Sequence, residues 1–233
     1  MPVDLVVFDW DGTLVDSIGR ISHCLALAAA DTGLPVLEAA RYRSVIGLGL
    51  PEALAALYPE ADTGARGALR AAYARHYIEA EREPCQPFAG AVEVLEALQA
   101  RGIRLAVATG KNRPGLERAF DGTGLRPRFA ASRTADESGS KPDPRMLLEL
   151  MGELCVSPAR TLMVGDTSFD LAMAARAGVP SIGMTHGAHE PGVLSGHDPV
   201  ALVHHFSQFL DTLDARLPPW RAARQTLAGE KAP

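Results

Sequence analysis

The sequence predicts an α/β fold in which a parallel sheet is covered by helices and carries an inserted α-helical domain. Apolar runs of strand length alternate with amphipathic segments of helix length, which is typical of a parallel sheet with crossover helices. The interval between the first two runs, about 70 residues from Val15 to Pro84, contains helical patterns and no convincing strand. Such an interval is far longer than an ordinary connection, so we expect an insertion there.

Five apolar runs are predicted to form the strands of the sheet. We expect strands near residues 3–9, 103–108, 128–132, 161–165 and 180–184. Helices are expected near 89–100, where Gly102 ends the pattern, and near 168–177, where Gly178 begins a Gly-Val-Pro terminator.

The interval between the first two strands is predicted to hold several helices. Asp16 and Ser17 can cap the first, which has an apolar face and ends at Gly33-Leu34-Pro35, and two more fit residues 51–58 and 63–83. We therefore expect a catalytic core and an inserted cap, hinged near Asp16 and Glu83-Pro84, with a mobile C-terminal tail. The predicted boundaries are 1–15 and 84–215 for the core, 16–83 for the cap and 216–233 for the tail.

Composition restricts the classes of function. The chain has 233 residues, of which 47% are hydrophobic and 22% charged, as in ordinary globular proteins. Its net charge is −5 and its basic residues are scattered, so we expect neither a nucleic-acid polymer nor a membrane surface as a partner.

The expected location is the cytoplasm. No apolar stretch approaches the roughly 20 residues that span a bilayer, and the N-terminus enters a strand almost at once, which leaves no room for a signal peptide. The cysteines lack the spacing of a metal or redox motif, so we expect them to be reduced thiols. They are Cys24, Cys85 and Cys155.

The segment Asp9-Trp10-Asp11-Gly12-Thr13 follows the first apolar run and is the most informative motif in the chain. Two carboxylates at the point where a buried strand opens onto solvent can serve as a nucleophile and its acid–base partner. Gly12 allows a sharp turn there, and Trp10 is expected to pack in the core.

Polar groups follow the other predicted strands in the same way. Thr109-Gly110-Lys111 ends the second strand, Lys141 lies in Ser140-Lys141-Pro142-Asp143-Pro144, and Asp166 and Asp170 follow the strand at 161–165. Because open parallel sheets bind ligands at the carboxyl ends of their strands, we expect these groups to converge on one site.

This series of motifs resembles the haloacid dehalogenase-like hydrolase superfamily, and within it the phosphoglycolate phosphatase-type enzymes with a small helical cap. The resemblance runs from about Val3 to about Leu213. It implies a three-layer Rossmann-like core with the inserted cap, and a phosphatase that cleaves a small phosphorylated metabolite through an aspartyl-phosphate. It also implies Mg²⁺ as the cofactor.

The resemblance implies a role for each acidic residue. Asp9 is expected to be the nucleophile, and Asp11 to protonate the leaving group and then deprotonate the attacking water. Mg²⁺, which prefers oxygen ligands, would be held by the Asp9 carboxylate, the backbone carbonyl of Asp11 and the Asp166 carboxylate. Asp170 is expected either to bind the metal through water or to orient Lys141.

The remaining polar residues are expected to bind phosphate. Thr109 and the amide of Gly110 resemble the family's phosphate-binding position, and Lys141 resembles the lysine that neutralises phosphate and nucleophile together. For Lys111 and Arg113 the sequence leaves two roles open: contact with the substrate, or a solvated charge on a loop.

Alternative functions share much of this pattern. A sugar phosphomutase similar to β-phosphoglucomutase would use the same four groups of residues, namely the Asp9 motif, Thr109, Lys141 and the Asp166 motif. A catalytically silent binding module could retain the fold. A haloacid dehalogenase would lack the second carboxylate of the first motif, so Asp11 argues against it.

The substrate and the oligomeric state are left open. The loop from Val45 to Pro51 is expected to face the site and has no charge, which argues against phosphoglycolate because its carboxylate needs a cationic partner. A broader specificity, pyrophosphate or a nucleotide stays possible, as does a monomer or a homodimer.

Overall fold

Six parallel strands form a single sheet in the computed structural model, which describes residues 3–216. Their order is β3-β2-β1-β4-β5-β6, so Val7 of the central strand pairs with Ala106 on one side and Met163 on the other. The order reverses at β1, and this is the position where open parallel sheets bind ligands. The strands are β1 (Leu5–Phe8), β2 (Arg104–Thr109), β3 (Ala131–Thr134), β4 (Thr161–Gly165), β5 (Ser181–Met184) and β6 (Ala201–Val203).

The strand predictions for β1, β2, β4 and β5 are confirmed to within two residues at each end. The third was placed too early, at 128–132, because Arg126–Arg128 forms a 3₁₀ turn around Pro127 and the strand begins only at Ala131. The edge strand β6 was missed, since its three residues are too few to show a period.

Side chains alternate across the sheet and build a core on each face. Val6 and Phe8 of β1 pack with α5 (Ala91–Ala100), α6 (Arg113–Thr123) and α10 (Phe209–Arg216). Leu5 and Val7 pack on the opposite face with α7 (Arg145–Glu153) and α8 (Ser168–Arg176). Trp10 packs edge-on against Phe120, as expected of a core residue. The result is the predicted three-layer α/β core, which includes a short α9 (Pro191–Ser195) after β5.

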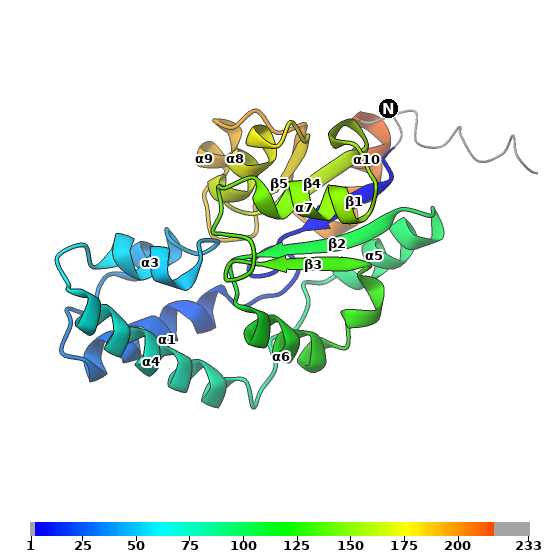
Figure 1. The fold of residues 1–233 in the computed structure, drawn as a ribbon. Coiled ribbons are helices and arrows are strands. Elements are labelled where there is room, and N and C mark those ends of the chain that lie inside the picture. Colours follow the sequence, from blue (N-terminus) through cyan, green and yellow to red (C-terminus); the bar gives the residue numbers. More distant parts are fainter. Residues whose placement is uncertain (1–2, 217–233) are drawn as a thin grey trace, which may run out of the picture.

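The interval between β1 and β2 folds into helices that lie to one side of the sheet, in blue to teal in Figure 1. We call these residues, 18–80, the helical insertion. They share an apolar cluster of their own that includes Leu25, Tyr42 and Leu69. The helices are α1 (Ile18–Asp31), α2 (Ala39–Arg43), α3 (Leu50–Leu57) and α4 (Thr63–Ala80).

Two details of the insertion differ from the prediction. The short α2 was not foreseen, and the side chain of Ser17 makes no capping hydrogen bond to α1 although Ser17 occupies the N-cap position. Its hydroxyl instead donates to Asp11, which fixes a residue of the candidate site.

The expected mobile tail, 216–233, lies outside the described residues apart from Arg216 at the end of α10. Within the described range, no helix combines the length and the apolar character required to cross a bilayer.

Candidate active site

The predicted site residues meet at the carboxyl ends of three neighbouring strands. Asp9 follows β1, Thr109 ends β2 and Asp166 follows β4. The backbone N–H of Asp9 donates to the carbonyl of Val164 at 2.9 Å, which continues the pairing of β1 with β4 up to the site. Lys141 reaches the same place from the loop that follows β3.

Lys141 is a buried cation between two buried carboxylates. Its ammonium donates to Asp9 Oδ1 and forms an ion pair of 2.7 Å with Asp170 Oδ1. None of the three side chains is more than 1% exposed. Burial alone would favour the neutral amine, but the charges of Asp170 and Asp9 outweigh it and hold the pKa of Lys141 above its ordinary value. The two carboxylates therefore stabilise the charged form of the lysine.

Three carboxylates surround this single cation. Asp9, Asp166 and Asp170 each offer an oxygen, and these atoms lie within 4.8 Å of one another. Burial, together with the neighbouring acids, raises the pKa of Asp9 and raises the pKa of Asp166 to about 7. Asp9 Oδ2 is buried and accepts no hydrogen bond from any residue in the described range. An unpartnered carboxylate oxygen in a cluster with excess negative charge fits a hard divalent cation.

Asp166 is held in place by segments far apart in the sequence. Its Oδ1 accepts from the Thr13 hydroxyl at 2.6 Å, and its Oδ2 accepts from the Ala188 N–H at 2.7 Å. Two glycines leave room for it: a Cβ at Gly12, where φ is +84°, would lie 2.4 Å from Asp166 Oδ2, and one at Gly187 only 2.1 Å. Any side chain at either position would displace the carboxylate.

The contact of Gly187 and Ala188 with Asp166 was not predicted from the sequence. The loop that contains both residues follows β5, and apart from the glycine itself nothing in its composition indicates contact with Asp166.

Asp170 is placed by the first turn of α8. Its Oδ2 accepts from the N–H of Thr167 at 3.1 Å, and its N–H donates to the hydroxyl of Thr167 at 3.3 Å, forming a capping box. The hydroxyl of Thr167 also donates to Oδ2 at 2.7 Å. The other oxygen, Oδ1, is left to face Lys141. Of the two roles expected for Asp170, this geometry favours the orientation of Lys141.

Asp11 points to different partners from Asp9. Its Oδ1 accepts from the hydroxyl of Ser17 at 2.6 Å and pairs with Lys111 Nζ at 3.0 Å, while Oδ2 has no hydrogen bond to a described residue. Lys111 also donates to the hydroxyl of Tyr77 on α4 at 3.0 Å. The sequence left open whether Lys111 contacts substrate or is a solvated loop residue. In the structure it pairs with Asp11 and contacts the helical insertion.

Thr109 and Gly110 lie beside these carboxylates at the end of β2. Thr109 is fully buried, and its Oγ1 accepts from the N–H of Lys111 at 3.2 Å. Gly110 is packed so closely that a Cβ would lie 2.4 Å from the carbonyl oxygen of Leu48 in the insertion.

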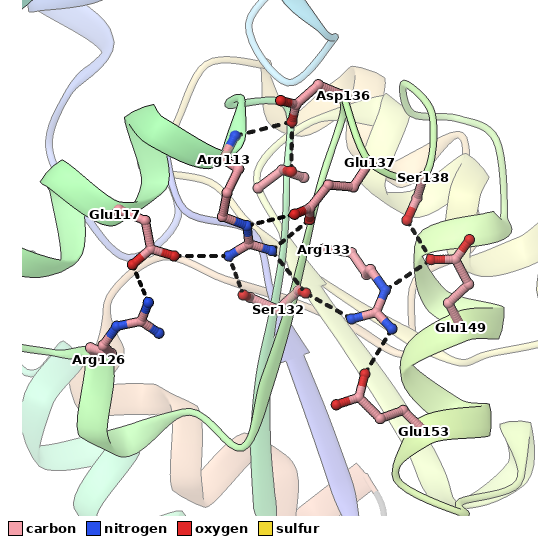
Figure 2. Close-up of polar contacts among 11 residues, drawn as sticks. Arg113, Glu117, Arg126, Ser132, Arg133, Asp136, Glu137, Ser138, Glu149 and Glu153 are labelled. Atoms are coloured by element: carbon pink, nitrogen blue, oxygen red, sulfur yellow. Dashed lines mark hydrogen bonds and ion pairs between the residues drawn. The ribbon is translucent and has the colours of Figure 1, made fainter.

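Arg113, the other residue left open, belongs to a network of ion pairs outside the site (Figure 2). It lies between Glu117 and Glu137, at 3.2 and 2.6 Å, and donates to the hydroxyl of Ser132 at 2.8 Å. Hydrogen bonds from Arg113, opposed by partial burial, lower the pKa of Glu137 to about 2. Arg113 is therefore a structural residue that ties α6 to the loop after β3.

A cavity of about 670 Å³ opens above the carboxylates, between the sheet edge and the helical insertion. Asp9, Asp11, Gly110 and Lys111 line it from the core, and side chains of α1, α3 and α4 line it from the insertion. A ligand in this cavity can therefore contact Asp9 and Asp11 at the same time.

Comparison with known proteins identifies relatives of this arrangement. Residues 3–178 match the model of the haloacid dehalogenase-like hydrolases. The chain is 35% identical over 222 residues to "Probable phosphatase IndB" of Dickeya dadantii, covering 91% of this chain and 94% of that protein. It is 34% identical over 196 residues to a phosphoglycolate phosphatase of Rhodospirillum rubrum, covering 80% and 81%. A solved hydrolase from Pseudomonas syringae has the same fold, with a TM-score of 0.84 and 24% identity over 92% of this chain and 99% of that one.

Proposed function

Because the chain belongs to the haloacid dehalogenase-like hydrolases, we propose that Asp9 is the nucleophile of a Mg²⁺-dependent phosphatase. The protein is a phosphoric monoester hydrolase. The observation that carries the role of Asp9 is its position: a buried carboxylate at the end of the central strand, held by Lys141 and open to the cavity.

The acid cluster supports Mg²⁺ as the cofactor. Asp9, Asp166 and the backbone carbonyl of Asp11 would hold the ion, and bound Mg²⁺ would neutralise the phosphate and the nucleophile as they approach. The unpartnered Oδ2 of Asp9 and the excess of carboxylates over Lys141 are the features of this chain that fit it.

The reaction divides into two displacements. The Asp9 carboxylate attacks phosphorus, the bond from phosphorus to the ester oxygen breaks, and Asp11 gives its proton to the departing alkoxide. Water then attacks the aspartyl-phosphate, Asp11 takes a proton from it, and inorganic phosphate leaves as the Asp9 carboxylate is restored. Ser17 and Lys111 hold Oδ1 of Asp11, so Oδ2 is the oxygen available to carry the proton.

The phosphoryl oxygens are bound from two sides. Lys141 supplies a fixed positive charge next to Asp9, and the Thr109 hydroxyl and Gly110 N–H are the donors at the end of β2. Donors held rigidly where charge develops stabilise the transition state more than mobile water does. Asp170 keeps Lys141 in this position.

The helical insertion would act as a cap that excludes bulk water and selects the substrate. Phosphoglycolate, named for the Rhodospirillum rubrum relative, is one of the substrates to be tested. All three cysteines are free thiols, which supports a cytoplasmic location. The phosphatase relatives support a small phosphorylated metabolite as the partner.

The proposal is tested by phosphate release with and without Mg²⁺ from phosphoglycolate, pyrophosphate, sugar phosphates and nucleotides, with Asp9→Asn as the control. We expect metal-dependent release that the substitution abolishes while the fold is retained. Substantial activity of Asp9→Asn would remove Asp9 as the nucleophile. Turnover of a sugar phosphate only after addition of a bisphosphate activator would favour the phosphomutase.

A further inference from the structure

The cavity above Asp9 is much larger than a two-carbon substrate requires. We propose that it accepts a phosphate monoester whose leaving group is bulky, uncharged and mainly apolar, an inference that rests on the proposed phosphatase function. Phosphoglycolate has only about nine non-hydrogen atoms, whereas cavities of roughly 300–1,000 Å³ hold drug-sized ligands. The cavity of about 670 Å³ lies in the middle of that range.

The helical insertion already contacts the core on several sides of the cavity. The Gly49 N–H donates to the Ser140 hydroxyl at 2.8 Å, and Arg43 donates to the carbonyl of Gly187 at 3.0 Å. On the other side, Lys111 donates to Tyr77 at 3.0 Å. With these contacts in place, a small substrate leaves much of the cavity of about 670 Å³ unfilled.

The wall that the insertion contributes is mostly apolar. Tyr73 and Tyr77 stand side by side on α4, with ring centroids 5.5 Å apart, and the Tyr73 hydroxyl donates no hydrogen bond to a residue of the described range. Aliphatic side chains complete the wall: Ile21, Leu25, Val45, Leu48 and Leu50. Such a surface stabilises apolar and aromatic groups by removing them from water.

The charged residues of the cavity argue against a second anionic group on the substrate. Four are acidic: Asp9, Asp11, Glu52 and Asp136. Three are basic: Arg70, Lys111 and Arg118.

Two of these cations are already neutralised. Lys111 pairs with Asp11 at 3.0 Å, and Arg118 pairs with Glu81 at 2.5 Å. Arg70 forms no ion pair with a described residue, but it is exposed on α4, where solvent screens its charge and makes it a weak partner for an anionic group. A carboxylate next to the ester oxygen, as in phosphoglycolate, would compete with Asp11 for Lys111. The acid–base residue would then lose its partner.

The test compares two esters whose leaving alcohols are almost equally acidic, ethyl phosphate and 2-phenylethyl phosphate, together with phosphoglycolate. We expect kcat/KM for 2-phenylethyl phosphate to exceed that for ethyl phosphate by about tenfold to a hundredfold, the gain for burying one phenyl ring. It should also exceed that for phosphoglycolate.

A matched pair of substitutions on α4 locates the effect. Ala74 and Ala68 are both exposed on the same helix, but only Ala74 lines the cavity. Ala74→Trp should reduce the preference for the phenylethyl ester over the ethyl ester by at least about tenfold, since an indole fills the space that the phenyl ring needs. Ala68→Trp should leave the preference as in the wild type.

Hydrolysis of acetyl phosphate, a small activated donor, distinguishes a failure of the proposed leaving-group preference from a failure of the phosphatase function. If acetyl phosphate is hydrolysed and phosphoglycolate or ethyl phosphate is the better ester, the inference about the leaving group is wrong and the phosphatase function stands. The same conclusion follows if Ala74→Trp and Ala68→Trp behave alike. If acetyl phosphate is not hydrolysed either, the proposed function fails and this inference fails with it.

Discussion

Replacement of Lys141 by Met should destabilise the protein strongly and in a pH-dependent way. The substitution leaves the carboxylates of Asp9 and Asp170, at most 1% exposed, without their shared cation. Removal of one partner of a buried ion pair costs about 3–5 kcal/mol, and no solvent screening reduces that cost here. For a chain of this size, about 2–4 °C of Tm corresponds to 1 kcal/mol, so we expect a loss of roughly 6–20 °C at neutral pH.

The sign of the pH dependence follows from Asp9. Burial already raises the pKa of Asp9 above its unfolded value, and loss of the charge of Lys141 raises it further. A carboxyl group whose pKa is higher in the folded than in the unfolded state stabilises the fold at low pH. This contribution is fully present below the pKa of the unfolded state and is lost as the pH rises through the pKa of the folded state. The deficit of the variant should therefore be smaller at pH 5 than at pH 7.5.

The assay is thermal unfolding in EDTA at the two pH values. Arg75→Met is the matched control, since Arg75 pairs with Asp31 at the surface, where the side chains are 65% and 43% exposed. Its Tm should stay close to that of the wild type. A Tm of Lys141→Met within about 2 °C of the wild type at pH 7.5, or an equal deficit at both pH values, would refute this reasoning.

Three further predictions concern the metal and the acid–base residue. Burial and the charge of Asp170 raise the pKa of Asp166 to about 7, so protons should compete with Mg²⁺ below that pH. Calorimetry should then show an affinity that falls by up to about tenfold per unit below pH 7; an equal Kd at pH 6 and pH 8 would contradict the assignment. Gly187→Ala places a Cβ 2.1 Å from Asp166 Oδ2 and should weaken Mg²⁺ binding by about 10–100-fold. Gly192→Ala is the control, since a Cβ there meets open space, and it should not change the affinity. Equal affinities of the two variants would show that Gly187 does not help to position Asp166 for the metal. Lys111→Met should lower single-turnover rates by about 10–100-fold by releasing Asp11, and an unchanged rate would show that the pair is only structural.

The sheet could be predicted from the sequence because its central strands are continuous apolar runs that alternate with helices. Leu5 to Phe8 and Thr161 to Gly165 are buried on both faces, and this produces such runs. The edge strand β6 has only three residues and could not be recognised.

The convergence of the site could also be predicted, because its groups lie at or beyond the carboxyl ends of strands. Asp9 and Asp166 come from adjacent strands, and Lys141 from the loop after β3. The contacts of Lys111 with Asp11 and Tyr77 depend on how the helical insertion packs, which local sequence does not encode. The size of the cavity above Asp9 also depends on this packing and could not be predicted from the sequence.

The central claim is that Asp9 becomes phosphorylated during turnover. It is tested most directly by acid quenching with substrate present, reduction of the acyl phosphate with borohydride and mass spectrometry of the peptide that contains residue 9. We expect homoserine at position 9 in the wild type, and none when substrate is omitted. Reduction at another carboxylate, or an unmodified Asp9 while phosphate is released, would contradict it.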